Sequence, residues 1–294
     1  MVVAQAGISV TGSVVRVTGS GLGCPEWPQC FPGSLTPVEH PEYAMLNQWV
    51  EFGNRLLINV IGLIALACLV SALLVRPRRK RLVWLAAAMP LGVAAQAVIG
   101  GVTVRLELAW WTVAIHFLAS MVLVWLATLL VGAVGEGDAP PRDRLGTAAR
   151  RLMPAMVAVL AALLVAGTLV TGAGPHAGDP DTPRLDLPVP ELARVHSGLL
   201  FGYLALLVAL GLLLRRDRAQ PVLWRRYRVL LVVVAAQGTL GYVQYWTGVP
   251  GALVAAHVLG AASVVIATAA LWTATRDRGP AAVPSPVDRE PVTA

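Results

Sequence analysis

The chain has 294 residues, of which 56% are hydrophobic and only 13% are charged. Soluble globular domains carry about twice that share of charged residues, so this composition predicts an integral membrane protein. The net charge of +7 would suggest nucleic-acid binding in a soluble protein, but here the basic residues recur between apolar runs. That alternation excludes a nucleic acid as the partner and is typical of membrane loops.

Seven apolar runs are long enough to cross a bilayer, which takes roughly 20 helical residues. We predict an all-α polytopic membrane protein with eight transmembrane helices, arranged as two four-helix bundles related by a pseudo-twofold axis. In chain order the seven runs cover residues 54–75, 82–104, 112–134, 151–172, 193–214, 227–246 and 252–275.

An eighth run, 1–17, is too short for a complete span. By symmetry with 151–172, which begins the second half of the chain, we expect a truncated first helix with residue 1 already inside it. A cleaved signal peptide is the alternative. The start of the chain, however, has neither the basic region nor the small-residue cleavage site of such a peptide.

The basic residues predict the orientation. Eighteen of the 23 Lys and Arg residues fall in every second connection between the runs and in the C-terminal tail. Because cytoplasmic loops carry the excess of Lys and Arg, these segments and both termini are expected in the cytoplasm. The sequence therefore predicts a multi-pass protein of the cell membrane.

Repeated sequence divides the chain into two halves. Gln96 and Gln237 are each followed 20 residues later by a histidine, His116 and His257, at an offset of 141 residues. Four helices return the chain to its starting side, so the two halves are expected to point the same way. The expected units are an N-terminal half at 1–134, a polar cytoplasmic linker at 135–150, a C-terminal half at 151–275 and a disordered cytoplasmic tail at 276–294.

Four residues of ligand type lie near the outer starts of the even-numbered helices: Asn54, His116, His196 and His257. An imidazole is costly to bury in lipid, so an intramembrane histidine marks a functional site by default. A single histidine could serve equally as a hydrogen-bonded contact between helices. Repeat-related histidines at matching depth instead favour metal or heme ligation on the extracytoplasmic side.

The ligand set favours heme over zinc. A zinc site needs four close ligands, usually with Cys or a carboxylate among them. His196 and His257, on facing helices of a four-helix bundle, suit the two axial positions of a six-coordinate heme. The first half keeps His116 but has Asn54 where the second half has His196.

Glu51 adds to this asymmetry, because the second half has Ala193 at the matching position. Glu51 lies three residues before Asn54, and residues at that spacing share a helix face. The carboxylate could stabilise positive charge that develops during an oxidation, or accept a proton. The alternative is an interfacial charge that only pairs with Arg55.

The outer loop carries Cys24 and Cys30, with five residues between them. That spacing is longer than a Cys-x-x-Cys redox motif, and no nearby histidine pattern indicates zinc. On an oxidising outer face we expect a disulfide, either structural or redox-active, with the structural role favoured. Cys68 lies in an apolar helix and is interpreted as a packing residue.

These residues resemble the pattern of the heme A synthase family over nearly the whole chain. The resemblance rests on Thr18-Gly19-Ser20-Gly21-Leu22-Gly23-Cys24-Pro25, Trp27-Pro28, Cys30, Glu51, Asn54-Arg55, His116, His196 and His257. It implies an enzyme that oxidises the C8 methyl group of heme O to the formyl group of heme A for cytochrome oxidase assembly.

The resemblance also implies the site residues and partners. Heme b would be the cofactor, with His196 and His257 as its iron ligands. The substrate heme O would occupy the N-terminal half beside His116, an iron ligand, with Asn54 and Arg55 nearby and Glu51 as the catalytic carboxylate. The implied partners are membrane lipids, a membrane electron acceptor with quinone as a candidate, heme O synthase as a candidate, and a second copy of the chain as a candidate homo-oligomer.

Two departures from the family pattern matter. The usual Glu-x-x-His-Arg is Glu-x-x-Asn-Arg here, so two histidine ligands are not expected in the first half. The outer loop at 175–191 has no cysteine, so a second disulfide is not expected.

Two rival functions use the same bundle and ligands: a diheme membrane cytochrome b for quinone-linked electron transfer, and a heme carrier. Glu51 and the unequal halves favour the enzyme.

Overall fold

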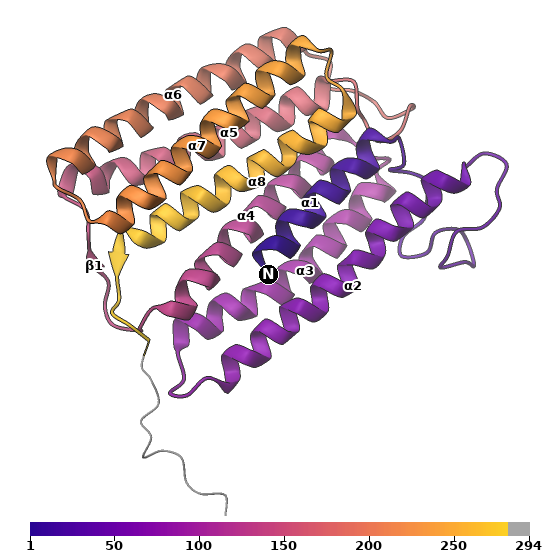
Figure 1. Cartoon of the computed structure of the whole chain (residues 1–294). Helices are drawn as coiled ribbons and strands as arrows, with labels where there is room; N and C mark the ends of the chain where they lie inside the picture. The colour runs from indigo at the N-terminus through magenta and orange to yellow at the C-terminus, as the bar shows by residue number, and fades with distance from the viewer. Residues whose placement is uncertain (282–294) are drawn as a thin grey trace, which may run out of the picture.

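The computed structural model describes residues 1–281, and the rest of the expected tail lies outside the described residues. The described part contains eight helices and one pair of two-residue strands (Figure 1). The elements are α1 (Val2–Val17), α2 (Met45–Leu74), α3 (Lys80–Arg105), α4 (Trp110–Gly135), β1 (Arg142–Asp143), α5 (Thr147–Ala173), α6 (Val189–Arg216), α7 (Pro221–Trp246), α8 (Gly251–Ala274) and β2 (Arg276–Asp277).

Seven of these helices are long and apolar enough to cross a membrane, and α1 is a shorter apolar helix. The prediction of an all-α polytopic membrane protein is therefore confirmed. Each of the seven predicted apolar runs lies on one helix to within a residue, although the helices begin one to nine residues before their runs, with the largest difference at Met45 of α2. The early turns of α2 carry polar residues that pack on the outer loop instead of facing lipid. Gln48, for example, is fully buried and accepts a hydrogen bond from the Val38 N–H at 3.0 Å.

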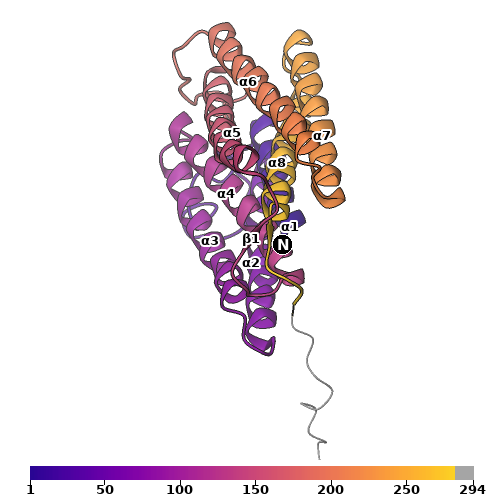
Figure 2. The ribbon, with the colours of Figure 1, turned by 90° about the vertical axis from the view of Figure 1, so that its left-hand side faces the viewer.

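The helices lie in two groups of four (Figures 1 and 2). In each group consecutive helices pack together and the first helix also contacts the fourth: α1 contacts α4, and α5 contacts α8. The groups meet where α8 packs against α1 and α4 and where α4 packs against α5. Because both groups have the same order of helix contacts, we propose that the two halves are structural units.

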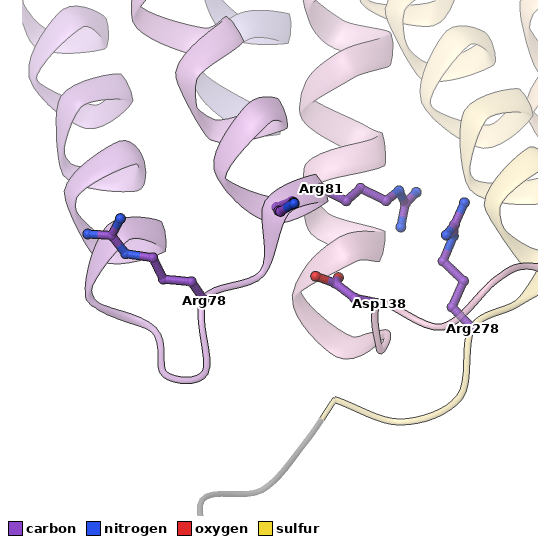
Figure 3. A pocket seen from close by; sticks show the side chains of 5 residues that line it. Arg78, Arg81, Asp138 and Arg278 are labelled. Carbon is purple, nitrogen blue, oxygen red and sulfur yellow. The ribbon is translucent and has the colours of Figure 1, made fainter.

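One end of the molecule is formed by the linker and the segment after α8. β1 and β2 pair antiparallel, with Arg142 opposite Asp277, and the Arg144 guanidinium lies 2.9 Å from the Asp277 carboxylate. Complementary charges thus tie residues 276 and 277 of the expected tail to the linker. Figure 3 shows Arg278 and Asp138 from the two segments near Arg81 of the first turn of α3, while the Arg78 side chain of the α2–α3 connection points to the other side.

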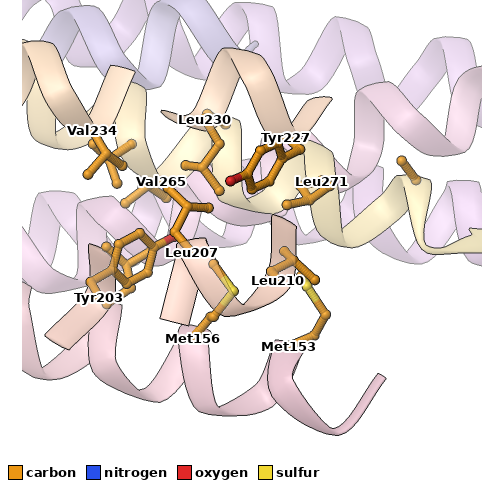
Figure 4. Close-up of a cluster of buried hydrophobic side chains, with 14 of the residues drawn as sticks. Met153, Met156, Tyr203, Leu207, Leu210, Tyr227, Leu230, Val234, Val265 and Leu271 are labelled. Carbon is orange, nitrogen blue, oxygen red and sulfur yellow. The ribbon is translucent and has the colours of Figure 1, made fainter. Parts of the chain in front are cut away.

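The C-terminal group has a well-packed apolar interior. Figure 4 shows Met153, Met156, Tyr203, Leu207, Leu210, Tyr227, Leu230, Val234, Val265 and Leu271, which belong to α5, α6, α7 and α8. The Tyr203 hydroxyl in this interior lies 2.9 Å from Thr268 Oγ1, which satisfies it. Buried hydroxyl groups normally need such a partner. The N-terminal interior instead uses small residues of α2, α3 and α4, which let the helices approach closely in a membrane.

Candidate functional site

Two histidine rings face each other inside the C-terminal group. His196 lies in the second turn of α6 and His257 in the second turn of α8. Their ring centroids are 6.4 Å apart. A metal–imidazole bond of about 2 Å, with the ring centroid about 1 Å beyond the nitrogen, puts two axial imidazole centroids about 6 Å apart. The spacing of the pair therefore fits two axial ligands on one heme iron.

The neighbouring helix orients the first of these rings. His196 Nδ1–H donates a hydrogen bond to the Leu163 carbonyl oxygen of α5 at 3.1 Å. This bond places the proton on Nδ1 and leaves the Nε2 lone pair free for a metal, as the outer partners of metal-binding histidines commonly do. His257 Nδ1 is buried without a hydrogen-bond partner among the described residues.

Glycine provides the surface on which each ring rests. A Cβ added to Gly167 of α5 would lie 3.1 Å from His196 Cε1, and one added to Gly241 of α7 would lie 3.0 Å from His257 Cε1. Contacts this short are rare for real side chains, so the rings lie directly on helix backbone. The absence of a Cβ allows this close approach.

The first half repeats the arrangement around His257. A Cβ added to Gly100 of α3 would lie 3.0 Å from His116 Cε1. Gln96 Nε2 donates to the His116 carbonyl oxygen at 3.2 Å. Gln237 Nε2 donates to the His257 carbonyl oxygen at 2.9 Å. Each half thus uses a glutamine and a glycine one turn apart to hold the backbone and ring of one histidine.

The fourth ligand-type position differs between the halves. Asn54 lies on α2, and its Oδ1 is buried without a hydrogen-bond partner among the described residues. Thr171 to Gly174 repeat the pattern of Thr18 to Gly21, and by that offset of 153 residues Gly167 corresponds to Val14. The first half therefore lacks both the second histidine and the glycine surface for its ring. Within residues 1–281, no hydrogen bond joins His116 to Asn54 or Glu51.

Glu51 is held at the boundary between α2 and the outer loop. Its side chain is only 6% exposed. One carboxylate oxygen accepts a hydrogen bond from the Cys24 N–H at 2.7 Å, and the other pairs with the Arg55 guanidinium. The pairing with Arg55 matches the alternative that the sequence left open, although Glu51 itself is buried.

Arg55 connects that carboxylate to the loop. Cys24 and Cys30 form a disulfide, as expected. The Arg55 guanidinium donates to the carbonyl oxygens of Cys24 at 2.6 Å, Glu26 at 2.8 Å and Gln29 at 3.0 Å. A guanidinium has five donors in a fixed plane, which suits it to several acceptors at once. The loop containing the disulfide is therefore fastened to α2 by one side chain.

The same loop also reaches α3. The Trp27 ring packs on Gly101, where a Cβ would lie 2.7 Å from the ring, and Arg105 donates to the Trp27 carbonyl oxygen at 3.2 Å. The loop thus covers the outer ends of α2 and α3. Counting 1.5 Å per residue, His116, His196, His257 and Asn54 lie about 9–14 Å from the starts of their helices, at this same end of the molecule.

Sequence reasoning found the repeated Gln and His but not the role of Gln96 and Gln237. It also did not predict that glycines would support the rings. The signal was present, since Gly100 and Gly241 each follow a repeated glutamine by four residues, one helical turn. Gly167 had no such signal, because the residue four positions before it is Leu163 and not a repeated glutamine.

Comparisons with known proteins agree with the sequence resemblance. A family model described as cytochrome oxidase assembly protein, COX15-CtaA, matches residues 1–179. A heme A synthase of Symbiobacterium thermophilum is 31% identical over 166 residues, which cover 56% of this chain and 52% of that protein. A heme A synthase of Geobacillus kaustophilus is 34% identical over 135 residues, which cover 44% of this chain and 39% of that protein.

A longer alignment is weaker in identity. A heme A synthase of Bartonella henselae is 23% identical over 323 aligned positions, covering 92% of this chain and 88% of that protein. The chain spans about half the length of the first relative above and less of the second. His196 and His257 lie beyond the segment that the family model matches.

Proposed function

The chain belongs to the COX15-CtaA family of cytochrome oxidase assembly proteins, and from that premise we propose that it is a heme A synthase. The reaction is oxidation of the C8 methyl group of heme O to the formyl group of heme A. The observation that carries the proposal is the inequality of the two halves. One half pairs two facing imidazoles, and the other offers one imidazole and a buried amide oxygen without a partner.

The C-terminal half would hold a resident heme b. His196 and His257 would hold its iron, and the Leu163 carbonyl and the two glycine surfaces fix the orientation of their rings. When bound, this heme supplies one-electron transfer. Two strong ligands favour permanent retention of a heme rather than exchange.

The N-terminal half would hold the substrate. His116 offers one iron ligand, positioned by Gln96 and Gly100. Asn54 offers a neutral amide oxygen, a weaker iron ligand than an imidazole. A site with one strong ligand suits a porphyrin that must enter, react and leave.

Glu51 is the proposed catalytic carboxylate. Oxidising a porphyrin methyl group gives its carbon cationic character, which a buried anion stabilises better than a group screened by water. The Cys24 N–H and Arg55 hold the carboxylate in a fixed position before the reaction. Arg55 also compensates part of its charge, so Glu51 would act as a positioned hydrogen-bond acceptor and local anion rather than as a free charge.

We propose the cell membrane as the location, with both termini cytoplasmic and the heme sites toward the extracytoplasmic side. The basic residues gathered at the linker end support this orientation. The proposed electron acceptor is a membrane compound, with quinone as a candidate. Heme O synthase is the candidate supplier of the substrate, and a second copy of the chain is a candidate partner.

Heme analysis tests the proposal. The chain is expressed in cells that make heme O but no heme A, and the extracted hemes are separated and identified by mass. We expect hydroxylated heme and heme A, both absent from cells with the empty vector. A purified protein that contains heme b but leaves heme O unchanged in these cells would instead favour the diheme cytochrome or the heme carrier.

A further inference from the structure

A basic hollow lies at the end of the molecule opposite the disulfide loop. It has a volume of about 370 Å³ and is lined by Arg78, Lys80, Arg81, Asp138 and Arg278 (Figure 3). We propose that this hollow binds the phosphate group of an anionic phospholipid. This inference is independent of the proposed function.

Three segments distant in the sequence form the hollow, and protein contacts fix them together. Arg79, buried behind the lining residues, donates to the carbonyl oxygens of Ala133 at 2.5 Å and Val134 at 3.1 Å. These bonds attach the α2–α3 connection to the end of α4. On the other side, the Gly137 N–H donates to the Gly279 carbonyl oxygen at 2.7 Å, which attaches the segment after β2 to the linker.

The charges of the hollow are only partly compensated. Arg81 pairs with Glu136 at 2.6 Å, and Asp138 lies 3.6 Å from Arg79. Within residues 1–281, Arg78, Lys80 and Arg278 have no carboxylate partner. The lining of the hollow therefore carries an excess of positive charge, which an anion would compensate. A phosphate supplies that charge and several acceptor oxygens, which Arg and Lys bind well.

The surroundings favour a lipid as the source of the phosphate. The hollow lies at the ends of membrane helices, where headgroups gather and where basic pockets recognise anionic lipids. Lys80, at the start of α3, is followed on the same helix face by Trp84, which is 77% exposed, and Leu91, which is 70% exposed. Tryptophan is enriched at the level of the headgroups. An acyl chain can therefore lie along α3 while the phosphate occupies the hollow.

Binding of defined lipids to the purified full-length protein tests the inference. The hollow variant combines Arg78→Gln, Lys80→Gln and Arg278→Gln. A matched variant removes three exposed basic residues at the same end but outside the hollow, combining Arg215→Gln, Arg225→Gln and Arg228→Gln. Affinity for phosphatidylglycerol is measured by native mass spectrometry in detergent, with phosphatidylcholine as the neutral lipid and inorganic phosphate as competitor.

We expect at least about tenfold weaker phosphatidylglycerol binding in the hollow variant, since each basic residue near an anionic surface contributes to the attraction. The matched variant should keep the parental affinity, and phosphatidylcholine should not bind at the hollow. Equal loss in both variants would overturn the site, because bulk charge would explain it. Displacement of the lipid by inorganic phosphate at equal concentration would overturn the lipid assignment in favour of a soluble phosphate.

A second pair of variants keeps the test valid if the triple variant does not fold. Lys80→Gln alone should weaken phosphatidylglycerol binding, and Lys80→Arg should restore it, because both cations bind phosphate. An unchanged affinity in Lys80→Gln, with Arg278→Gln also unchanged, would contradict the proposal.

Discussion

Histidine and glycine form a repeated unit in this molecule. Each of the three intramembrane histidines rests on a glycine of a neighbouring helix, and two of them also have their backbone carbonyl bound by a glutamine. Ring position is thus set by backbone, which moves less than side chains do. A ligand held in this way keeps its geometry without help from the metal, which is the usual requirement for a precise binding site.

The first prediction concerns the proposed iron ligands. His196→Ala and His257→Ala should each abolish or alter the low-spin heme spectrum of the purified protein, because an imidazole would be lost from an axial position. His176→Ala is the control, since His176 lies between α5 and α6 and contacts the Val249 carbonyl oxygen. Optical and electron paramagnetic resonance spectra provide the measurement. Unchanged spectra in both ligand variants would refute the assignment.

The second prediction concerns the glycine surfaces. Gly167→Ala and Gly241→Ala should each displace a histidine ring by a few tenths of an ångström and destabilise the fold by about 1–3 kcal/mol, as overpacking does. The measurable result is a shift in the low-spin resonance positions together with weaker heme retention. Gly198→Ala and Gly202→Ala serve as controls, because a Cβ at either position meets nothing within 4 Å. The idea fails if all four variants behave alike.

At the scale of elements, the loop before α2 behaves as part of the site. Its disulfide joins Cys24 to Cys30, and the side chains of Arg55 and Glu51 in α2 form hydrogen bonds with the loop backbone. Loops usually carry higher mobility than the helices they connect. Here a single guanidinium removes much of that freedom, because it bonds three carbonyl oxygens within Cys24–Cys30.

The third prediction tests that anchor. Arg55→Ala should leave the buried Glu51 carboxylate without its cation and should cost about 3 kcal/mol or more. Hydrogen exchange of residues 24–30 should rise markedly. Arg55→Lys should rescue only part of the effect, because an ammonium cannot reproduce the planar set of donors. Arg105→Ala, which removes only one bond to Trp27, is the matched control and should change exchange little.

Element boundaries show what the sequence could and could not predict. Apolar runs located all the spanning helices, because lipid exposure requires apolar side chains along most of each helix. The start of α2 was missed because Gln48 and Glu51 are buried by a loop and not by lipid. The strand pair at Arg142 and Arg276 was missed because it depends on residues more than 130 positions apart in the chain. The repeat spacing predicted that His116 and His257 are equivalent residues of the two halves. It could not predict that Gly167 of α5 lies against the His196 ring.

At the scale of the whole molecule, the two groups of four helices share one arrangement of helices but differ in the residues at their candidate sites. The glutamine, glycine and histidine of the last two helices occur in both groups. The second histidine and its glycine occur only in the C-terminal group, and the buried carboxylate Glu51 only in the N-terminal group. In the proposed function, such divergence would separate a site that retains its heme from one that exchanges it.

The last prediction follows from that separation. If Glu51 serves chemistry in the N-terminal half, Glu51→Gln should leave the low-spin heme of the C-terminal half intact. Heme A formation should nevertheless fall by at least about 10²-fold, as is typical when an electrostatic stabiliser is removed. Glu51→Asp should retain part of the activity, because it keeps the charge on a shorter side chain.

The design must separate catalysis from the structural role of the Glu51–Arg55 pair. Arg55→Ala loosens the loop and removes the cation beside Glu51 but keeps the carboxylate, so it reports the loss of the ion pair without the loss of the acid. We expect Glu51→Gln to lower heme A formation more than Arg55→Ala at equal heme b content. If Glu51→Gln makes heme A at the parental rate, the carboxylate is only a loop anchor. If both variants lose activity in proportion to hydrogen exchange of residues 24–30, the loop and not the charge controls the reaction.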